Sequence, residues 1–317
     1  MWVTRVAAID CGTNSIRLLV ADLPEEDSGK DLVDLTRRME IVRLGQGVDR
    51  TGRLAPEAIE RTRTALLGYA AEIAELGVSR VRMCATSASR DAANAADFTT
   101  MVRATLGVDP EVITGEEEAR LSFAGAVTGL VADEPYLVVD IGGGSTEFVV
   151  GGADVEHAIS VDIGCVRMTE RHLHGDPPTP AEVAAAELDV TRAVDTALRK
   201  VSGHATATLV GLAGSITTVT AHALGLPEYR RERVNQAELP VQAVLDSCAA
   251  LVEAPRAERA AMGFLHPGRV DVIAAGALVW SEVITRVVAD VAAAGGSLTS
   301  VVTSEHDILD GIALSMA

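Results

Sequence analysis

Apolar positions along the chain repeat with two different periods, and these predict strands alternating with helices. Short apolar runs bounded by turn residues predict strands, whereas apolar residues three or four positions apart predict helices. In the first part of the chain the predicted elements are a hairpin at 3–22, strands at 39–48, 80–85 and 110–114, helices at 56–76 and 115–129, and a loop and helix at 86–106. Strands and helices in this order predict a mixed sheet covered by helices.

The second part of the chain repeats this plan with different lengths. Its predicted elements are a hairpin at 136–150, strands at 155–162, 206–211 and 301–304, and helices at 164–174, 181–201, 215–224, 240–252, 254–263, 268–294 and 307–316. A chain of 317 residues is also more typical of two domains than of one, and each domain can bury its own core. The sequence therefore predicts two α/β domains.

The two predicted hairpins share one sequence pattern in their turns. The turns align residue by residue, and the matching pairs are Asp10 and Asp140, Gly12 and Gly142, and Ser15 and Ser145. Glycine leaves the backbone N–H groups of a turn uncovered, so that a large anion can approach them. Two such turns, each next to a carboxylate, predict a pair of loops that hold a phosphate chain.

Charge and composition narrow the range of ligands. The net charge of −18 argues against a protein that holds nucleic acid along its surface, because such proteins are usually basic. A polyanionic ligand would have to be bound by local arginines, backbone amides and metal ions. The two lysines, Lys30 and Lys200, lie outside any lysine-containing phosphate loop. Phosphate recognition is therefore expected to depend on arginine and on the backbone.

Targeting signals and cysteines bear on the location of the protein. The N-terminal segment lacks the features of a signal peptide, and no apolar stretch is long enough to suggest a membrane span. The four cysteines are scattered and predict reduced, buried thiols rather than a disulfide framework or a zinc site. We expect a cytoplasmic protein with neither membrane nor nucleic-acid partners.

The second turn, DIGGGSTE (140–147), carries the strongest chemical signal. Three consecutive glycines are costly in a turn that needs only one or two, and this favours phosphate binding over a plain hairpin turn. The segment does not fit a dinucleotide-binding fingerprint, since a strand rather than a helix follows it. Asp140 enters the turn from a buried strand, where a carboxylate needs a cation or hydrogen-bond donors. Mg²⁺ beside a phosphate is the natural partner.

Three further segments leave two interpretations open when only their residues are considered. In TGEEEARL (114–121) the acids suit a capped helix start, yet three adjacent glutamates exceed that need, and one could be a general base. TSASRDAAN (86–94) is either an anion site that includes Arg90 or a serine-capped helix with a surface arginine. GLAGSITT (211–218) either shapes a nucleotide site or lets a helix pack closely.

Taken in order, these segments and RVDVIAAGA (269–277) resemble the exopolyphosphatase/guanosine pentaphosphate phosphatase (Ppx/GppA) family of the acetate kinase–sugar kinase–Hsp70–actin superfamily. The paired loops alone indicate the superfamily, and G-x-E-E-A-R-L before the second loop makes the resemblance specific for the family. The resemblance covers essentially the whole chain. It implies two actin-like (ribonuclease H-like) α/β domains, each a five-stranded mixed sheet with helices, around an interdomain cleft. Domain I is expected at 1–123 plus 300–317, and domain II at 124–299.

The resemblance also implies roles for individual residues. Glu118 would activate the attacking water, and Arg90 would grip the phosphate. Asp140 would bind Mg²⁺, with Glu147 as an outer ligand. The expected substrate-binding residues are Asp10, Gly12, Thr13, Asn14 and Ser15 in the first loop, Gly142, Gly143, Gly144, Ser145 and Thr146 in the second, and Arg269. The implied activity is hydrolysis of the terminal phosphoanhydride of inorganic polyphosphate, with a homodimer as a common state among relatives.

Two departures from the family pattern bear on this expectation. Leu309 stands where the family tends to have an arginine, so an anion contact or a domain contact is expected to be lost or moved. The chain also ends without the additional helical region of longer relatives, which favours short polyphosphate as the substrate. The alternatives are a guanosine pentaphosphate 5′-phosphatase, which uses the same site on a nucleotide, and a non-catalytic phosphate or nucleotide sensor.

Overall fold

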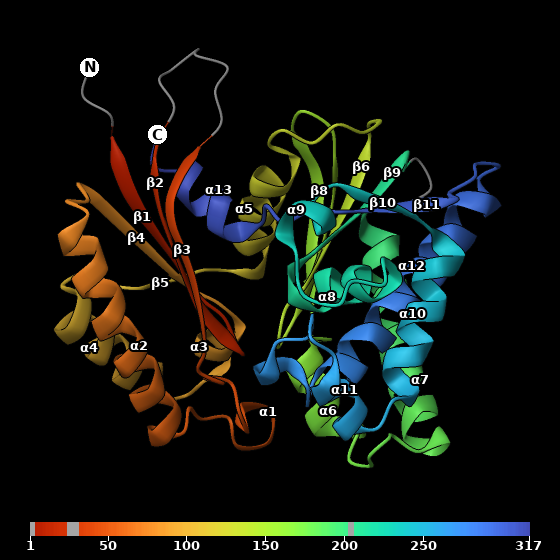
Figure 1. Ribbon diagram of the computed structural model, residues 1–317, viewed down its shortest axis with the longest axis horizontal. Coiled ribbons are helices and arrows are strands. Elements are labelled where there is room, and N and C mark those ends of the chain that lie inside the picture. Colours follow the sequence, from red (N-terminus) through yellow and green to blue (C-terminus); the bar gives the residue numbers. More distant parts are fainter. Residues whose placement is uncertain (1–3, 24–31, 202–205) are drawn as a thin grey trace. The chain divides into compact units, whose positions relative to one another are not determined.

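The protein consists of two compact units of similar construction (Figure 1). The structure, a computed structural model, describes residues 4–23, 32–201 and 206–317. Unit 1 comprises Met1–Gly129 and His306–Ala317, and unit 2 comprises Leu130–Glu305. The chain therefore leaves unit 1, forms unit 2 and returns to unit 1 at its C-terminal end.

Some sequence predictions fall outside this description or stay untested. The first residue of the predicted hairpin, at position 3, and Lys30 lie outside the described residues. The predicted domain bounds, 1–123 plus 300–317 and 124–299, differ by six residues from each of the two crossovers in the structure, and these bounds remain a prediction.

Unit 1 is built on a five-stranded sheet with the strand order β3-β2-β1-β4-β5. Strands β1, β2 and β3 form an antiparallel meander, and β4 and β5 continue the sheet parallel to β1. The strands are β1 (Arg5–Cys11), β2 (Ser15–Asp22), β3 (Val33–Ile41), β4 (Arg80–Ala85) and β5 (Glu111–Val112). The helices are α1 (Val48–Thr51), α2 (Pro56–Glu75), α3 (Ser87–Asp91), α4 (Ala95–Leu106), α5 (Gly115–Val127) and α13 (Ile308–Leu314).

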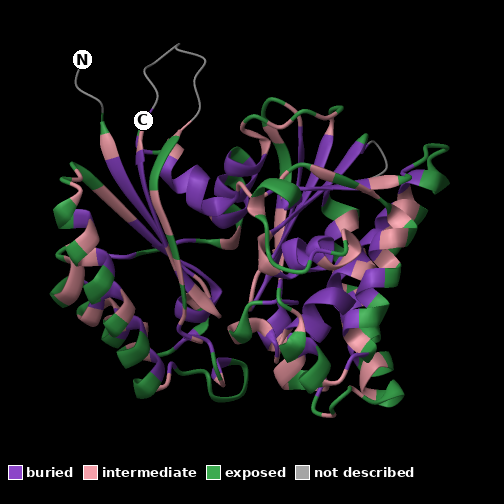
Figure 2. Ribbon diagram, in the orientation of Figure 1, coloured by how far each residue is buried: buried purple, intermediate pink, exposed green. Residues whose placement is uncertain are grey.

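Helices cover both faces of the sheet in unit 1, which explains why its central strands are apolar at nearly every position. Ala7 and Ile9 of β1 pack with α2 and α4, whereas Val6 and Ala8 pack with α13 and the middle of α5. A strand that is buried on both faces loses the alternation of apolar and polar residues. Figure 2 shows β1 and β2 buried along most of their length.

Unit 2 is built on a six-stranded sheet with the strand order β10-β11-β9-β6-β7-β8. Its strands are β6 (Tyr136–Ile141), β7 (Thr146–Gly151), β8 (Val155–Val161), β9 (Thr208–Leu212), β10 (Ala237–Pro240) and β11 (Ser300–Thr303). Its α-helices are α6 (Cys165–His172), α7 (Pro180–Val201), α8 (Ala213–Ala223), α9 (Arg231–Val234), α10 (Val241–Glu253), α11 (Arg256–Ala261) and α12 (Ile273–Ala293), and a 3-10 turn spans Pro267–Arg269.

The two sheets have the same topology. In unit 2, β6, β7 and β8 form the antiparallel meander, and β9 and β11 run parallel to β6, as β4 and β5 do beside β1. The predicted fold class, two actin-like α/β domains with mixed sheets, is thus confirmed. The second sheet differs from the expected five strands by β10, which pairs antiparallel with β11 at the edge. The four residues of β10, AELP, lack the apolar run that reveals the equally short β11.

Most predicted helices and strands lie within a few residues of their predicted bounds, but the strand expected at 39–48 is wrong, because β3 spans Val33–Ile41 and shares only positions 39–41 with it. The structure also differs from the loop and helix expected at 86–106. The structure has α3 and α4 instead, separated where Ala92 adopts an extended backbone. The side chain of Asn94 explains the break, because it accepts a hydrogen bond from Leu54 N at 2.8 Å and donates one to Leu54 O at 3.1 Å. A contact with a distant loop overrides local helix propensity here.

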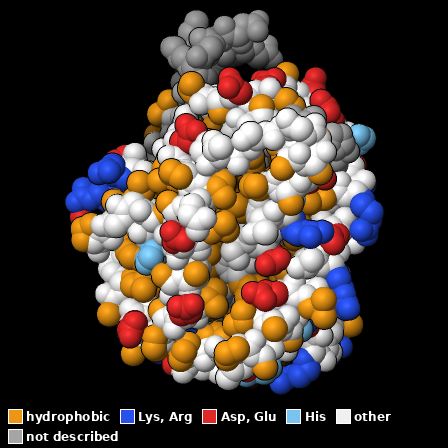
Figure 3. All heavy atoms as spheres, turned by 90° about the vertical axis from the view of Figure 1, so that its right-hand side faces the viewer, with side chains coloured by type: hydrophobic (Ala, Val, Ile, Leu, Met, Phe, Trp, Pro, Cys, Tyr) orange, Lys and Arg blue, Asp and Glu red, His pale blue; other side chains and the backbone are white. Residues whose placement is uncertain are grey.

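The surface carries charges of both signs. On the face drawn in Figure 3, basic and acidic side chains stand singly or in small groups among apolar and uncharged atoms. Attraction for an anion on this face is therefore local. Among the described residues, no helix combines the length and apolar composition needed to cross a membrane.

Candidate active site

The two glycine-containing turns have the same backbone geometry. Gly12 N–H donates to Ser15 O at 3.0 Å, and Gly142 N–H donates to Ser145 O at 3.0 Å. Each turn joins the first two strands of its sheet, β1 to β2 and β6 to β7. The repeat seen in the sequence is therefore a repeat in three dimensions, with one loop in each unit.

The first loop is fixed to the start of α3. The hydroxyl groups of Thr13 and Ser87 lie 2.8 Å apart and are buried, which joins the loop to the TSASRD segment. Asn14 O accepts hydrogen bonds from the N–H groups of Val42 and Arg43 at 3.1 and 2.8 Å. The loop is thus held from two sides by contacts that leave its glycine uncovered.

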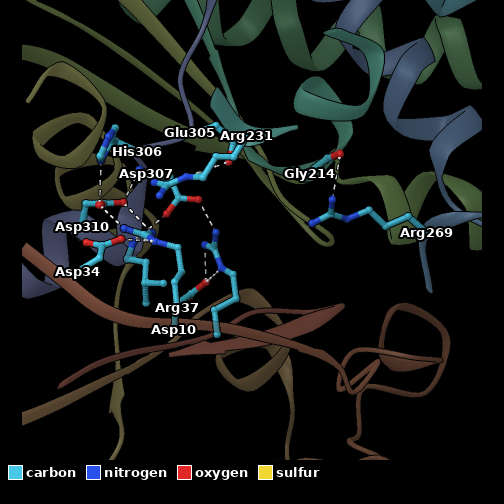
Figure 4. A network of polar contacts seen from close by, with 12 residues as sticks. Asp10, Asp34, Arg37, Gly214, Arg231, Arg269, Glu305, His306, Asp307 and Asp310 are labelled. Atoms are coloured by element: carbon cyan, nitrogen blue, oxygen red, sulfur yellow. Dashed lines mark hydrogen bonds and ion pairs between the residues drawn. The ribbon is translucent and has the colours of Figure 1, made fainter. Parts of the chain in front are cut away.

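Asp10, at the end of β1, is held by an arginine that the sequence did not single out. Arg17 of β2 stands directly opposite Asp10 and donates to its Oδ2 atom from Nε at 3.0 Å and from Nη2 at 2.7 Å. The same guanidinium donates from Nη1 to Asp307 Oδ2 (Figure 4). Burial raises the pKa of Asp10, and the charge and hydrogen bonds of Arg17 offset this only in part. Arg17 therefore donates hydrogen bonds to two buried carboxylates, Asp10 and Asp307.

The segment that begins α13 carries a second such contact. Arg37 of β3 donates to both carboxylate oxygens of Asp310, at 3.2 and 2.6 Å, and to Asp34 Oδ2 at 3.0 Å. His306 Nδ1 lies 3.0 Å from Asp310 Oδ1 (Figure 4). Leu309, which replaces the arginine of the family pattern, is buried in the apolar core of unit 1. The positive charges that contact this segment come instead from Arg17 of β2 and Arg37 of β3.

Glu118 is the buried acid of the three adjacent glutamates at the start of α5. It is 8% exposed, and its Oε2 atom lies 3.2 Å from Nη1 of Arg90. The same Arg90 nitrogen donates to Ile113 O at 3.0 Å, whereas Nε and Nη2 make no hydrogen bond to the described parts of the chain. Arg90 therefore orients Glu118 and still has donors for an anion.

The second loop is packed against the start of α6. Gly142 O accepts from Cys165 N at 3.0 Å, and Gly143 O accepts from Val166 N at 2.9 Å. The Nε atom of Arg167, another residue that the sequence did not single out, donates to Gly144 O at 2.7 Å. The carbonyl groups of the glycines are therefore engaged by α6.

Gly164 is expected to be indispensable for the position of the second loop. A Cβ atom at this residue would collide with the backbone of Gly143 and Gly144. We expect Gly164→Ala to displace the loop and to lower the rate of phosphate release about 10²-fold, since misplacement by about 1 Å can have such an effect. The matched control is Gly68→Ala, where an added Cβ atom meets nothing within 4 Å. Equal activity of both variants, measured as phosphate release, would contradict this prediction.

Two acids of unit 2 form a carboxylate pair beside the second loop. Asp140 and Glu147 are directly opposite each other on β6 and β7, and are 7% and 1% exposed. Facing residues in such a pair have Cβ atoms about 4.5–5.5 Å apart on the same side of the sheet. Ser160 donates to Glu147 Oε1 at 2.7 Å. Two adjacent carboxylates offer the oxygen ligands that a hard divalent cation prefers.

The surroundings do not offer a larger cage for that cation. Within the described parts of the chain, no group of three or more His, Cys, Asp or Glu side chains is placed to hold a metal ion. Mg²⁺ is usually held by one or two carboxylates and completes its shell with water and phosphate oxygens. The pair of acids therefore fits Mg²⁺ better than a metal that needs a complete protein cage.

Arg269 ends the 3-10 turn Pro267–Arg269, and its side chain reaches the start of α8, the helix that directly follows β9. Its guanidinium packs on the backbone of Gly214, where an added Cβ atom would collide with it, and Nη1 donates to Gly214 O at 3.4 Å. Leu212, two residues earlier, pairs with Asp140 in the parallel register of β9 and β6. Asp140 and the residue that Arg269 contacts, Gly214, therefore both lie near the C-terminal ends of the parallel strands β6 and β9.

The structure brings most of the predicted site residues together within each unit. In unit 1 the first loop, Arg90 and Glu118 are joined through α3, and in unit 2 the second loop, Asp140 and Glu147 lie on one hairpin. Thr146 is an exception, because its hydroxyl is buried and donates to Ile163 O. The alignment of the two hairpin turns identifies Arg17 as a further candidate site residue, since it aligns with Glu147.

Comparison with known proteins agrees with this geometry. The sequence model of the Ppx/GppA phosphatase family matches residues 23–316. Exopolyphosphatase 2 of Mycobacterium tuberculosis is 50% identical over 323 aligned residues, which cover 100% of both chains. Two solved structures are similar over nearly their whole length. An exopolyphosphatase-like protein has 44% identity and a TM-score of 0.95, covering 99% of this chain and 98% of the other. The Ppx/GppA family member of Aquifex aeolicus has 32% identity and a TM-score of 0.80, covering 99% and 98%. The chain therefore belongs to the Ppx/GppA phosphatase family.

Proposed function

We propose that the protein is an exopolyphosphatase that hydrolyses the terminal phosphoanhydride of inorganic polyphosphate and releases orthophosphate. The observation that carries this proposal is the relative named an exopolyphosphatase, which is 50% identical over the full length of both chains. The two phosphate loops and the buried Glu118 support it, because hydrolysis needs an anion site and a base. A cytoplasmic location and a homodimer stay predictions.

In unit 1, Glu118 is proposed as the general base. Its carboxylate takes a proton from water while the water oxygen attacks the terminal phosphorus in line. The anhydride P–O bond breaks, and the shortened polyphosphate leaves with the bonding electrons. Arg90 holds Glu118 at 3.2 Å and offers its remaining N–H groups to the phosphoryl oxygens. The first loop, Asp10 to Ser15, presents its turn to the phosphate chain.

In unit 2, the second loop and Arg269 are proposed to bind the phosphate chain. Asp140 and Glu147 would hold Mg²⁺, which supplies positive charge beside the phosphoryl oxygens when it is bound. Gly142 to Ser145 form a turn without bulky side chains, which permits close approach of an anion. The loop stays in place because α6 binds its carbonyl groups, so its shape does not depend on substrate.

The test is phosphate release with Mg²⁺ from short-chain polyphosphate, long-chain polyphosphate and guanosine pentaphosphate, measured side by side. We expect release from polyphosphate, with short chains preferred. Rates that rise steadily with chain length would contradict the preference for short chains. Release from the nucleotide alone would replace the proposal by a guanosine pentaphosphate phosphatase, and release from none of the three would leave a sensor.

A further inference from the structure

The two loops have the same backbone but opposite charges at one aligned position. Directly across the hairpin from the loop aspartate stands Arg17 in unit 1 and Glu147 in unit 2. The backbone hydrogen bond that closes each turn is the same, at 3.0 Å. The difference between the loops is therefore one of charge rather than of shape.

In the first loop, Arg17 places a positive charge directly beside Asp10. Two of its nitrogens donate to Asp10 Oδ2, at 3.0 and 2.7 Å. Oδ1 of Asp10 makes no hydrogen bond to any described residue, so a single carboxylate oxygen remains for another ligand. One oxygen next to a guanidinium is a poor site for a divalent cation, because the two positive charges repel each other.

Asp307 fixes Arg17 in this place. Its Oδ2 atom accepts from Arg17 Nη1, while its Oδ1 atom accepts from Leu309 N at 2.9 Å and caps α13. Both oxygens of Asp307 thus accept hydrogen bonds, and one of the two donors is Arg17. Burial opposes the charge on Arg17, yet Asp307 and Asp10 outweigh it and hold the pKa of the guanidinium well above its ordinary value.

In the second loop, the same position adds negative charge. Glu147 brings a second carboxylate beside Asp140, and both are buried. Carboxylate oxygens are the ligands that a hard divalent cation prefers, and one or two carboxylates are enough to hold Mg²⁺ beside a phosphate. The pair differs from Asp10 and Arg17 by two units of charge.

We propose that the residue opposite the loop aspartate decides which loop binds the divalent cation. Glu147 directs the ion to the second loop, and Arg17 keeps the first loop free of metal and serves there as a built-in cation. Asp307 is a positioning residue that acts through Arg17. This inference rests on the proposed Mg²⁺-assisted function, but it concerns cation binding and can be tested without turnover.

The experiment counts Mn²⁺ ions bound to the full chain, with Mn²⁺ as the spectroscopically visible substitute for Mg²⁺. Paramagnetic resonance of free Mn²⁺ and calorimetric titration would measure the stoichiometry without substrate. We expect one ion per chain, lost in Asp140→Asn and unchanged in Asp10→Asn. Glu147→Arg copies the charge of the first loop and is expected to abolish binding. Arg17→Glu copies the charge of the second loop and is expected to add a second ion.

Other outcomes would overturn the inference. One such outcome is two Mn²⁺ ions bound per wild-type chain, of which Asp10→Asn loses one. A second is a wild-type chain that binds no Mn²⁺, and a third is a Glu147→Arg variant that still binds the ion. Thermal melting shows whether each variant is folded, and Glu147→Gln, expected to weaken binding at least tenfold, replaces Glu147→Arg if the latter does not fold. Phosphate release is measured separately, so that an inactive protein with the expected stoichiometry would refute the exopolyphosphatase and leave this inference standing.

Discussion

Replacing Glu118 by glutamine is expected to lower the rate of phosphate release by about 10²–10⁴-fold, the usual contribution of a general base. Glutamine keeps the shape of the side chain and a hydrogen-bonding oxygen for Arg90, but it cannot take a proton from water. The carboxylate lies 3.2 Å from Arg90 and is almost completely buried, so the substitution removes the base and leaves the packing intact. Steady-state phosphate release from polyphosphate at saturating Mg²⁺ measures the effect.

The helix itself supplies a matched control for this variant. Glu116 is two residues away, is exposed, and pairs with Arg120 at 3.0 Å on the surface of α5. Glu116→Gln removes the same charge from the same helix turn, and its rate is expected to stay within a factor of two to three of the wild type. Unchanged turnover in Glu118→Gln, or equal losses in both variants, would refute Glu118 as the base.

Replacing Arg37 by alanine is expected to destabilise unit 1 by about 3–5 kcal/mol, the usual effect of breaking a buried ion pair. Asp310 is 1% exposed and receives two hydrogen bonds from Arg37, so the variant leaves a carboxylate buried next to α13 without its main counter-charge. The free energy of unfolding, from urea titrations monitored by circular dichroism, measures the loss.

The neighbouring arginine on the same strand is the control for this prediction. Arg38 is half exposed and pairs with Glu72 at 3.4 Å, so Arg38→Ala is expected to cost about 0–1 kcal/mol. The double variant Arg37→Met with Asp310→Asn removes both charges, keeps an acceptor for Asp307 N, and should recover most of the stability that Arg37→Ala loses. A loss below 1 kcal/mol in Arg37→Ala would show that Asp310 does not depend on Arg37.

The same pair predicts how stability changes in acid. Burial acts to raise the pKa of Asp310, but the hydrogen bond with His306 and the charge of Arg37 outweigh it and hold this pKa well below its ordinary value. A carboxyl group with a depressed pKa in the folded state stabilises the protein above its unfolded pKa, which is about 3.9. This contribution is lost as the pH falls through the folded pKa. We therefore expect the urea midpoint to fall more steeply below about pH 4 in the wild type than in Asp310→Asn.

Much of the candidate site was predictable because its signals are local in sequence. The turn at Gly142 and its counterpart at Gly12 each follow an apolar strand, and the same residue types recur at the same spacing. Such a pattern fixes the backbone of a hairpin wherever the hairpin lies in the protein. The elements that the sequence does not predict, α1, α9 and β10, span four residues each and contain no apolar run.

Contacts between distant segments could not be predicted in this way. Arg17 and Asp307 are 290 residues apart in the chain, and they meet because α13 returns to pack on the sheet of unit 1. The break at Asn94 likewise depends on Leu54, which is 40 residues away. No period or composition of either segment records these partners, since each contact exists only after both segments have packed.

The sequence by itself determined the alternation of strands and helices, the two equivalent loops and the capped start of α5, because these follow from local spacing and side-chain chemistry. Only the tertiary structure decided which of three adjacent glutamates is buried, and that Arg17 is shared by Asp10 and Asp307. It also placed Asp140 opposite Glu147. The physical reason is that burial and ion pairing depend on which surfaces pack together, and this is a property of the whole fold.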